Sequence, residues 1–220
     1  MVKILIGTPA YNATVCSQYT KSLVSTCLLL NSMNIEFNVH FINNQIVTRA
    51  RNMIAHIFMN GDYSHLMFID ADVIWNPEDV IKLLNHKKEC IIGIYPNKGY
   101  KRVENNMIVA PSSQILENTA NKTNNLHKDL INIKRAATGF MLLTKDALKR
   151  IQPDIDQFYL PSGNEMCFLY NYFNCMVVEN DYLTEDFYFS YLYIKNGGEI
   201  FADKTIKMLH VGNHEYGSLA

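Results

Sequence analysis

The sequence places two aspartates, two residues apart, at the end of an apolar stretch. His65-Leu66-Met67-Phe68-Ile69 runs directly into Asp70-Ala71-Asp72. We expect the apolar stretch to be a buried strand, and ligands of open α/β sheets bind where such strands end. Carboxylate oxygens in that place suit Mg²⁺ or Mn²⁺ bridging a diphosphate. A solvated turn would explain the same two residues, so the pair alone leaves both interpretations open.

A second candidate follows the first apolar stretch, where Thr8-Pro9-Ala10-Tyr11 comes after Gly7. A dinucleotide-binding fold would have G-x-G-x-x-G here, and a P-loop would have G-K-[ST]. Neither pattern is present. The segment offers backbone groups and one aromatic ring, which suit a flat base better than a phosphate. Taken alone, it fits a structural turn better than a binding site.

Two further candidates lie near the C-terminal end of the sequence. Thr184-Glu185-Asp186 has the pattern of a helix start, with Thr184 as cap and two acids in the first turn. His210 follows a short apolar stretch, and a lone histidine there is more often hydrogen-bonded in a core or on a surface than bound to a metal.

The elements that must position these residues alternate between strands and helices. A buried apolar run predicts a strand and a 3.6-residue apolar stripe predicts a helix, and their alternation in the first half predicts a parallel sheet with right-handed crossovers. Residues 97–134 are rich in Asn, Lys and Ser and predict a long excursion rather than an ordinary connection. We expect strands at 2–8, 35–42, 65–69, 90–95 and 136–143, helices at 15–33, 46–59, 77–86, 145–151 and 183–195, antiparallel strands within 158–178 and short strands within 199–209.

Composition limits the class of protein. The 220 residues are 48% hydrophobic, with 20 Lys and Arg against 21 Asp and Glu, which indicates one globular domain and gives no basis for a nucleic-acid or anionic-membrane partner. The five cysteines include no C-x-x-C pair, so neither a disulfide framework nor a thiolate zinc site is indicated. No apolar run approaches a membrane span or a signal peptide, so we expect a cytoplasmic protein without a membrane span.

Seven segments, taken together and in order, resemble GT-A glycosyltransferases over nearly the whole chain. The resemblance is to the small GT-A domains of large algal DNA viruses and of bacterial polysaccharide clusters. The segments are Thr8-Pro9-Ala10-Tyr11, Ala50-Arg51-Asn52, Phe68-Ile69-Asp70-Ala71-Asp72-Val73, Gly93-Ile94-Tyr95-Pro96, Ala137-Thr138-Gly139-Phe140-Met141-Leu142, Thr184-Glu185-Asp186 and 201–212.

The resemblance implies an α/β GT-A (Rossmann-like) fold, with a mostly parallel central sheet flanked by helices and a small antiparallel C-terminal part. It implies a single domain over 1–220, in which 1–96 bind the nucleotide and 97–220 bind the donor sugar and acceptor. It further implies a hexosyl- or deoxyhexosyltransferase that uses a UDP-sugar and Mn²⁺ or Mg²⁺ to modify a glycan or glycoprotein. If the protein is viral, its location would be the host cytoplasm.

The resemblance also implies roles for individual residues. Thr8, Pro9, Ala10 and Tyr11 would hold the uridine, and Arg51 would reach the diphosphate or brace the carboxylates. Asp70, with Ala71 beside it, would contact the ribose or the metal, and Asp72 and His210 would bind the metal. Gly139 and Phe140 would line the donor-sugar pocket, Lys204 would contact a phosphate, and Asp186 would be the general base or orient the sugar.

Three alternatives stay open or are disfavoured by particular residues. A degenerate GT-A module would bind a nucleotide or glycan without turnover, and it gains weight because a long acceptor-binding extension is missing or is supplied by a further domain. A haloacid-dehalogenase phosphatase would use Asp70 as its nucleophile, but two predicted strands precede the motif here. A sugar nucleotidyltransferase would need a Gly-rich basic loop after the first strand, and that loop is absent.

Overall fold

The computed structural model describes residues 2–103, 106–116, 129–162, 165–212 and 215–217. Its helices are α1 (Ser17–Ser32), α2 (Val47–Asn60), α3 (Pro77–Asn85), α4 (Lys145–Ile151) and α5 (Glu185–Lys195), with 3-10 turns at Tyr11–Ala13 and Gln152–Asp154. The strands of the largest sheet are β1 (Lys3–Ala10), β2 (Glu36–Asn43), β3 (His65–Ile69), β5 (Cys90–Ile92), β8 (Gln114–Ile115), β9 (Leu130–Arg135), β10 (Phe140–Thr144) and β15 (Ile200–Asp203).

The expected α/β class is confirmed, with one large sheet between two layers of helices. The strand order is β2-β1-β3-β10-β5-β15-β9-β8. The expectation of a mostly parallel sheet is wrong beyond its N-terminal part. The pairs β1–β2, β1–β3 and β5–β15 are parallel, whereas β10 runs antiparallel between β3 and β5, and β9 is antiparallel to both its neighbours. An apolar run indicates a buried strand but not the direction in which it runs. The direction depends on the edge of the sheet at which the preceding segment ends.

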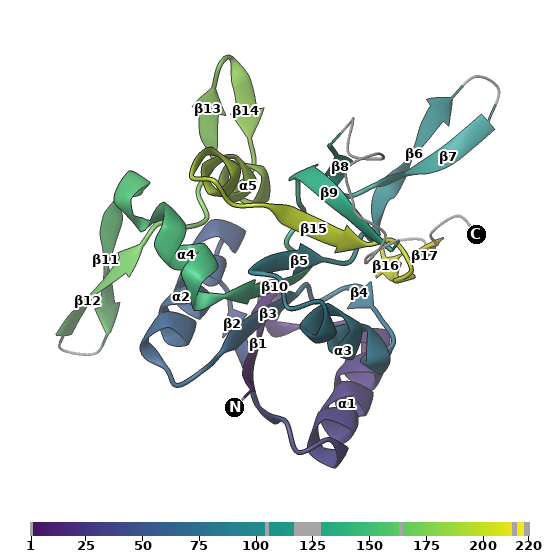
Figure 1. Cartoon of the computed structure of the whole chain (residues 1–220), viewed down its shortest axis with the longest axis horizontal. Helices are drawn as coiled ribbons and strands as arrows, with labels where there is room; N and C mark the ends of the chain where they lie inside the picture. Colours follow the sequence, from purple (N-terminus) through teal and green to yellow (C-terminus); the bar gives the residue numbers. More distant parts are fainter. Residues whose placement is uncertain (1, 104–105, 117–128, 163–164, 213–214, 218–220) are drawn as a thin grey trace.

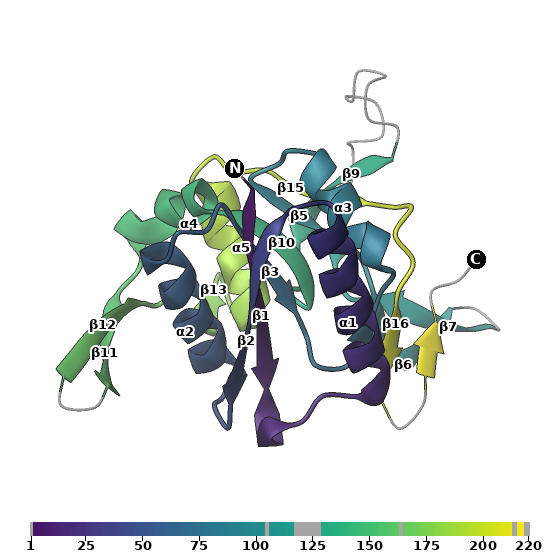
Figure 2. The same ribbon diagram turned by 90° about the horizontal axis from the view of Figure 1, so that it is seen from below.

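Helices cover both faces of this sheet, as Figure 2 shows, and the core lies between them and the sheet. Along β3, Leu66 and Phe68 pack with α2, α4 and α5, while Met67 and Ile69 face α1 and α3. This two-residue alternation explains why Leu66 to Ile69 are all apolar, since both faces of the strand are buried there. The strand can therefore change to polar residues only where it leaves the sheet, at Asp70.

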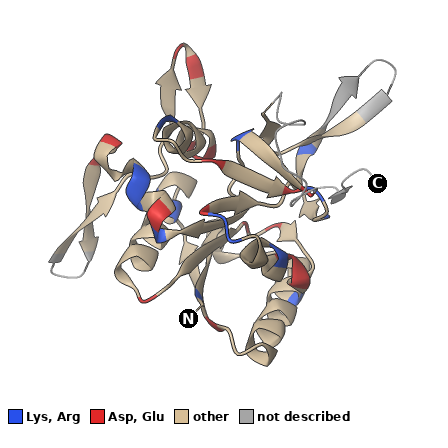
Figure 3. Cartoon of the chain, viewed as in Figure 1, with Lys and Arg blue, Asp and Glu red and all other residues tan. Residues whose placement is uncertain are grey.

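The helix boundaries follow local sequence signals closely. Helix α3 begins at Pro77, as its sequence predicts, and the backbone N–H of Asn76 donates to the Asp79 carboxylate at 3.2 Å. None of the helices in the described ranges is long and apolar enough to cross a membrane. Basic and acidic residues are interspersed along the chain (Figure 3), in keeping with the formal net charge of -1.

The segment 97–134 is more ordered than its composition indicates. It contains most of β6 (Pro96–Val103), together with β7 (Asn106–Pro111), β8 and β9, while 117–128 lie outside the described residues. Three hairpins project from the body in Figure 1: β6–β7, the pair β11 (Gln157–Ser162) and β12 (Glu165–Tyr170), and the pair β13 (Met176–Val178) and β14 (Asp181–Leu183). The antiparallel pairing expected within 158–178 is confirmed. A further small sheet joins β4 (Val73–Ile74), β16 (Leu209–Val211) and β17 (Glu215–Gly217).

Candidate active site

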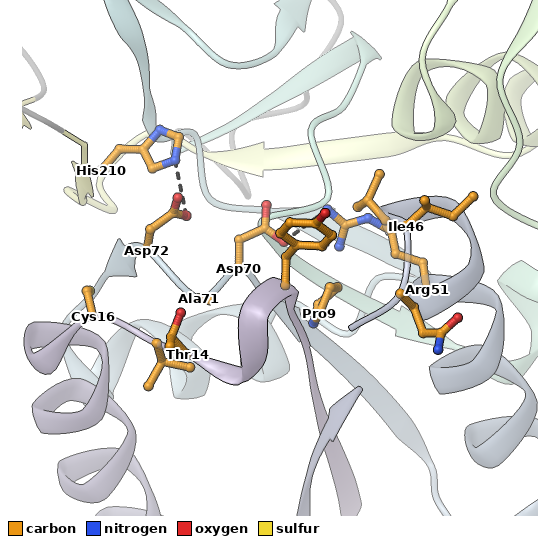
Figure 4. Close-up of a pocket in the computed structure, with 13 residues that line it drawn as sticks. Pro9, Thr14, Cys16, Ile46, Arg51, Asp70, Ala71, Asp72 and His210 are labelled. Carbon is orange, nitrogen blue, oxygen red and sulfur yellow. Dashed lines mark hydrogen bonds and ion pairs between the residues drawn. The ribbon is translucent and has the colours of Figure 1, made fainter. Parts of the chain in front are cut away.

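A cleft of about 900 Å³ opens where β1 and β3 end, shown in Figure 4. This volume is within the range of small-molecule and cofactor sites. Its walls come from the turn after β1, the start of α2, the end of β3 and strand β16. The lining residues are Pro9, Tyr11, Thr14, Val15, Cys16, Gln45, Ile46, Val47, Arg51, Asp70, Ala71, Asp72 and His210.

The four predicted binding residues at the end of β1, Thr8 to Tyr11, do not all face the cleft. The strand continues to Ala10, and the turn begins only at Tyr11. Pro9 and Tyr11 line the cleft, and Tyr11 is 69% exposed. Thr8 and Ala10 are buried, and the Thr8 hydroxyl is 2.5 Å from the Tyr19 hydroxyl. Because side chains alternate along a strand, only every second residue of this segment can touch a ligand in the cleft.

At one end of the cleft, Arg51 lies between the carboxylates of Asp70 and Glu185 and pairs with both. It comes from the first turns of α2 and is 3% exposed. Its Nη2 donates to Asp70 Oδ1 at 2.9 Å and its Nε donates to Glu185 Oε1 at 3.3 Å. Burial by itself lowers the pKa of Arg51, but Asp70 and Glu185 outweigh it, so the pKa is raised and the guanidinium stays charged. Its Nη1 is buried with no partner among the described residues.

Gly139 lies against the same aspartate. The backbone N–H of Asp70 donates to the Gly139 carbonyl at 3.0 Å, and the Gly139 N–H donates to the Tyr95 hydroxyl at 3.2 Å. A Cβ at position 139 would lie 2.4 Å from the Tyr95 hydroxyl and 2.7 Å from Asp70 Oδ2. Glycine therefore allows β10 to approach the end of β3. Phe140, the next residue, is fully buried beside Trp75 in the core, away from the cleft lining.

Asp72 and His210 form the other end of the cleft. Strand β16 pairs with β4, and the Val211 N–H donates to the Asp72 carbonyl at 2.8 Å, which brings the two side chains together. His210 Nε2 lies 3.3 Å from Asp72 Oδ1, and Lys98 Nζ donates to Asp72 Oδ2. Burial alone raises the pKa of Asp72, but hydrogen bonds from His210 and Lys98 outweigh it and lower the pKa below its usual range.

The imidazole of His210 is fixed by the backbone. Its Nδ1 is 2.9 Å from the Pro96 carbonyl, which can only accept, so Nδ1 carries the proton and donates. Nε2, on the other side of the ring, donates to Asp72 Oδ1 when it carries a proton, and its lone pair becomes available to a cation once that proton is lost. Metal-bound histidines commonly have this arrangement, with the other ring N–H donated to a carbonyl or carboxylate.

These two side chains fit a divalent cation. One carboxylate and one imidazole suit Mn²⁺ better than Mg²⁺, which prefers oxygen alone. Asp70, the third predicted ligand, is instead held by Arg51. Within the described ranges no group of three or more His, Cys, Asp or Glu side chains is arranged to hold a metal, so a bound cation would need ligands from a substrate as well.

Helix α5 brings two acids close to Arg51, although neither Glu185 nor Asp186 is among the residues that line the cleft. Glu185 pairs with Arg51, while Asp186 Oδ1 accepts from the Thr184 hydroxyl at 2.5 Å and the Phe187 N–H at 2.8 Å. Burial first, and then the neighbouring Glu185, raise the pKa of Asp186. Thr184 is the N-cap residue of α5, as expected, but its hydroxyl donates to Asp186 instead of accepting a helix N–H.

The lysine that contacts the acidic motif is not Lys204, the one named from the sequence. Lys204 is exposed in the turn after β15, where its backbone N–H donates to the Asp129 carbonyl, and it is not among the residues that line the cleft. The lysine that reaches the acidic motif is Lys98. Sequence reasoning missed it because nothing in the Asn- and Lys-rich segment distinguishes one lysine from another.

Neither a protein-family model nor a curated protein matches this sequence. Three solved structures are similar in fold at low identity. A197 from STIV has a TM-score of 0.48 and 14% identity, covering 100% of this chain and 95% of that chain. A UDP-glucose pyrophosphorylase complexed with UDP-glucose has a TM-score of 0.47 and 12% identity, covering 95% and 93%. A glycosyltransferase involved in the glycosylation of the major capsid of PBCV-1 has a TM-score of 0.34 and 11% identity, covering 68% and 63%. Likenesses of this strength assign neither a family nor an activity to the chain.

Proposed function

We propose that the protein is a metal-dependent glycosyltransferase that moves a hexosyl or deoxyhexosyl group from a UDP-sugar to a hydroxyl of a glycan or glycoprotein. One observation carries the proposal: the Asp72–His210 pair and the Arg51–Asp70–Glu185 network lie at two ends of a single cleft. The segments that supply them are far apart in the sequence. Their convergence is what a site for a charged, two-part ligand requires.

The nucleoside end of the donor would lie against the turn after β1. Pro9 and Tyr11 on one side, and Ile46 and Val47 on the other, give the cleft apolar walls near its entrance. A flat base can stack on such surfaces, whereas the segment has no glycine-rich loop to hold phosphates. Affinity should therefore depend on the base, and we expect UDP to bind more tightly than ADP in calorimetry. Equal affinities would remove this part of the proposal.

Asp72 and His210 would hold the cation, whose chemistry would be Lewis-acid stabilisation of the charge that develops on the departing diphosphate. His210 is already oriented for this role by the Pro96 carbonyl. Asp70 is oriented by Arg51 and would contact the ribose or the sugar. Arg51 therefore acts on the donor through Asp70.

Asp186 would accept the proton of the acceptor hydroxyl. In the transfer, the bond between the sugar C1 and the phosphate oxygen breaks, the electron pair leaves with UDP, and the acceptor oxygen bonds to C1 as its proton passes to Asp186. Thr184 and Phe187 both donate to Oδ1, and among the described residues no hydrogen bond to Oδ2 is found, so Oδ2 would be the oxygen that accepts the proton. Its raised pKa makes it a stronger base than an ordinary aspartate. A base in this position suits inversion at C1.

The deciding experiment measures UDP release from a panel of UDP-sugars with and without Mn²⁺. Metal-dependent release that rises with an added acceptor supports the transferase. Tight UDP binding without turnover would favour the binding module instead. Release of phosphate from phosphomonoesters would favour a phosphatase, although Asp70 is bound by Arg51 here rather than free to attack.

A further inference from the structure

Lys98 is a cation that the chain itself places on the predicted metal ligand. We propose that Lys98 holds Asp72 in the nucleotide-free protein, gives way to the divalent cation, and then binds the phosphates of the donor. The inference rests on the proposed function for the identity of the phosphate ligand. It assigns a binding role to a residue outside the acidic motif.

Both oxygens of the Asp72 carboxylate are occupied. Lys98 Nζ donates to Oδ2, and His210 Nε2 is 3.3 Å from Oδ1. A divalent cation needs at least one of these oxygens as a ligand. Since His210 is tied to the Pro96 carbonyl and would itself be a ligand, Lys98 is the group that has to leave.

The exchange of Lys98 for a cation would need only the Lys98 side chain to move. Pro96 and Lys98 belong to the same strand, β6, which packs against β16. One short segment thus orients His210 through the Pro96 carbonyl and neutralises Asp72 through Lys98. The Lys98 side chain is 36% exposed, so its ammonium can swing into water or toward a ligand without disturbing the core.

Charge explains why the lysine would move to the phosphates. A cation of charge +2 at Asp72 repels the ammonium that it replaces, whereas the diphosphate that arrives with it attracts the ammonium. A flexible lysine is a common phosphate ligand because it acts as a movable point charge. The same side chain would therefore oppose metal binding before the nucleotide arrives and favour nucleotide binding afterwards.

The test measures Mn²⁺ affinity by calorimetry in nucleotide-free protein. Lys98→Met removes the competing charge and should tighten Mn²⁺ binding about tenfold, while Lys98→Arg keeps the charge and should stay near wild type. Lys149→Met is the matched control, because Lys149 also pairs with an aspartate, Asp146 at 3.4 Å, but on the exposed surface of α4. It should leave Mn²⁺ affinity unchanged. Unchanged Mn²⁺ affinity in Lys98→Met would overturn the proposal.

The second measurement is UDP affinity at saturating Mn²⁺. Lys98→Met should weaken UDP binding about tenfold, since one charge-assisted hydrogen bond to a phosphate is lost. The two effects of one substitution then have opposite signs, which a general loss of structure would not produce. UDP affinity equal to wild type would overturn the transfer of Lys98 to the phosphates.

These outcomes are separable from those of the proposed function. If Lys98→Met tightens Mn²⁺ binding and weakens UDP binding but no UDP-sugar is turned over, the ion exchange stands and the transferase is wrong. If UDP-sugar turnover is normal and Mn²⁺ affinity does not change in Lys98→Met, the transferase stands and the exchange is wrong. Failure of both the wild-type and the Lys98→Met protein to bind Mn²⁺ would overturn the exchange directly.

Discussion

The two aspartates of the acidic motif, Asp70 and Asp72, are separated only by Ala71 but have different partners. Asp70 is held by the buried Arg51, whose other side pairs with Glu185. Asp72 faces the open cleft and is held by His210 and the partly exposed Lys98. The first arrangement is centred on a buried guanidinium, although Asp70 also lines the cleft and its side chain is 25% exposed, and the second consists of partners that a ligand can replace.

This difference predicts different losses of stability when the two ion pairs are broken. Breaking a buried ion pair from one side leaves a charge without a partner in a region that water does not reach, so it destabilises the fold. Breaking an exposed pair changes stability little, because water replaces the partner. We therefore expect substitutions around Asp70 to lower the free energy of unfolding, and substitutions around Asp72 to lower the rate of turnover.

The largest effect is expected at Arg51. Arg51→Ala leaves Asp70 and Glu185 close to one another without a cation and should lower the free energy of unfolding by about 3–5 kcal/mol. Chemical denaturation followed by circular dichroism measures this change. Arg49→Ala, at an exposed position on the same helix, is the control and should stay within about 0.5 kcal/mol of wild type. Equal losses in the two variants would show that the Arg51 network does not hold the fold.

Asp72→Asn and His210→Ala should show the reverse pattern. Each should lower Mn²⁺-dependent turnover of a UDP-sugar at least about 10³-fold, equivalent to about 4 kcal/mol in the barrier, because the cation loses one of its two protein ligands. The free energy of unfolding of Asp72→Asn should change by no more than about 1 kcal/mol, since the Asp72 side chain is partly exposed. Normal turnover in His210→Ala would remove the histidine from the site.

Asp186→Asn tests catalysis separately from binding. The amide keeps the shape of the side chain but cannot accept the proton, so the transfer rate should fall about 10²–10⁴-fold while UDP and Mn²⁺ affinities stay near wild type. If nucleotide affinity fell with the rate, Asp186 would belong to the metal or phosphate site. An unchanged rate would make Glu185 the next candidate, although Arg51 already holds that carboxylate.

The smallest effect concerns pH. Protonated Asp186 cannot act as a base, and its raised pKa means that more of it is protonated at a given acidic pH than of an ordinary aspartate. The transfer rate should therefore fall as pH drops through that raised pKa. The Thr184 hydroxyl lowers the pKa by donating to the carboxylate, so Thr184→Val should move this acid limb to higher pH. A limb that moves to lower pH, or does not move, would contradict the assignment of Asp186.

The sequence predicted the elements well wherever local chemistry decides them. The strand of 65–69 is buried on both faces and has only apolar or weakly polar residues, and helix α3 carries Asn76, Pro77 and Asp79 at its start. The direction of β10 was not predictable, because its residues would be equally apolar in either orientation. It was equally unpredictable which residues of Thr8 to Tyr11 face the cleft. Strand β1 continues through Pro9 and Ala10, beyond its predicted end at residue 8, and the alternation along this added part decides which side chains face the cleft.

In the candidate site, contacts between recognisable motifs were predicted and contacts from outside them were not. The resemblance placed Asp72 and His210 together, and Arg51 near the carboxylates, which the structure also does. It did not indicate that Lys98, rather than Lys204, meets the acidic motif. That contact depends on how β6 packs against β16, and no residue pattern within 97–134 encodes that packing.

The pairing of β16 with β4 has a consequence for the order of events during synthesis. Strands β1 and β3 and the acidic motif are made early, and domains fold from their N-terminal parts as the chain emerges. His210 reaches Asp72 only after β16 has been made and has paired with β4. A nascent chain can thus have much of the central sheet in place while Asp72 still lacks its histidine, so the ability to bind a cation would be acquired only after the strands of that sheet have been made.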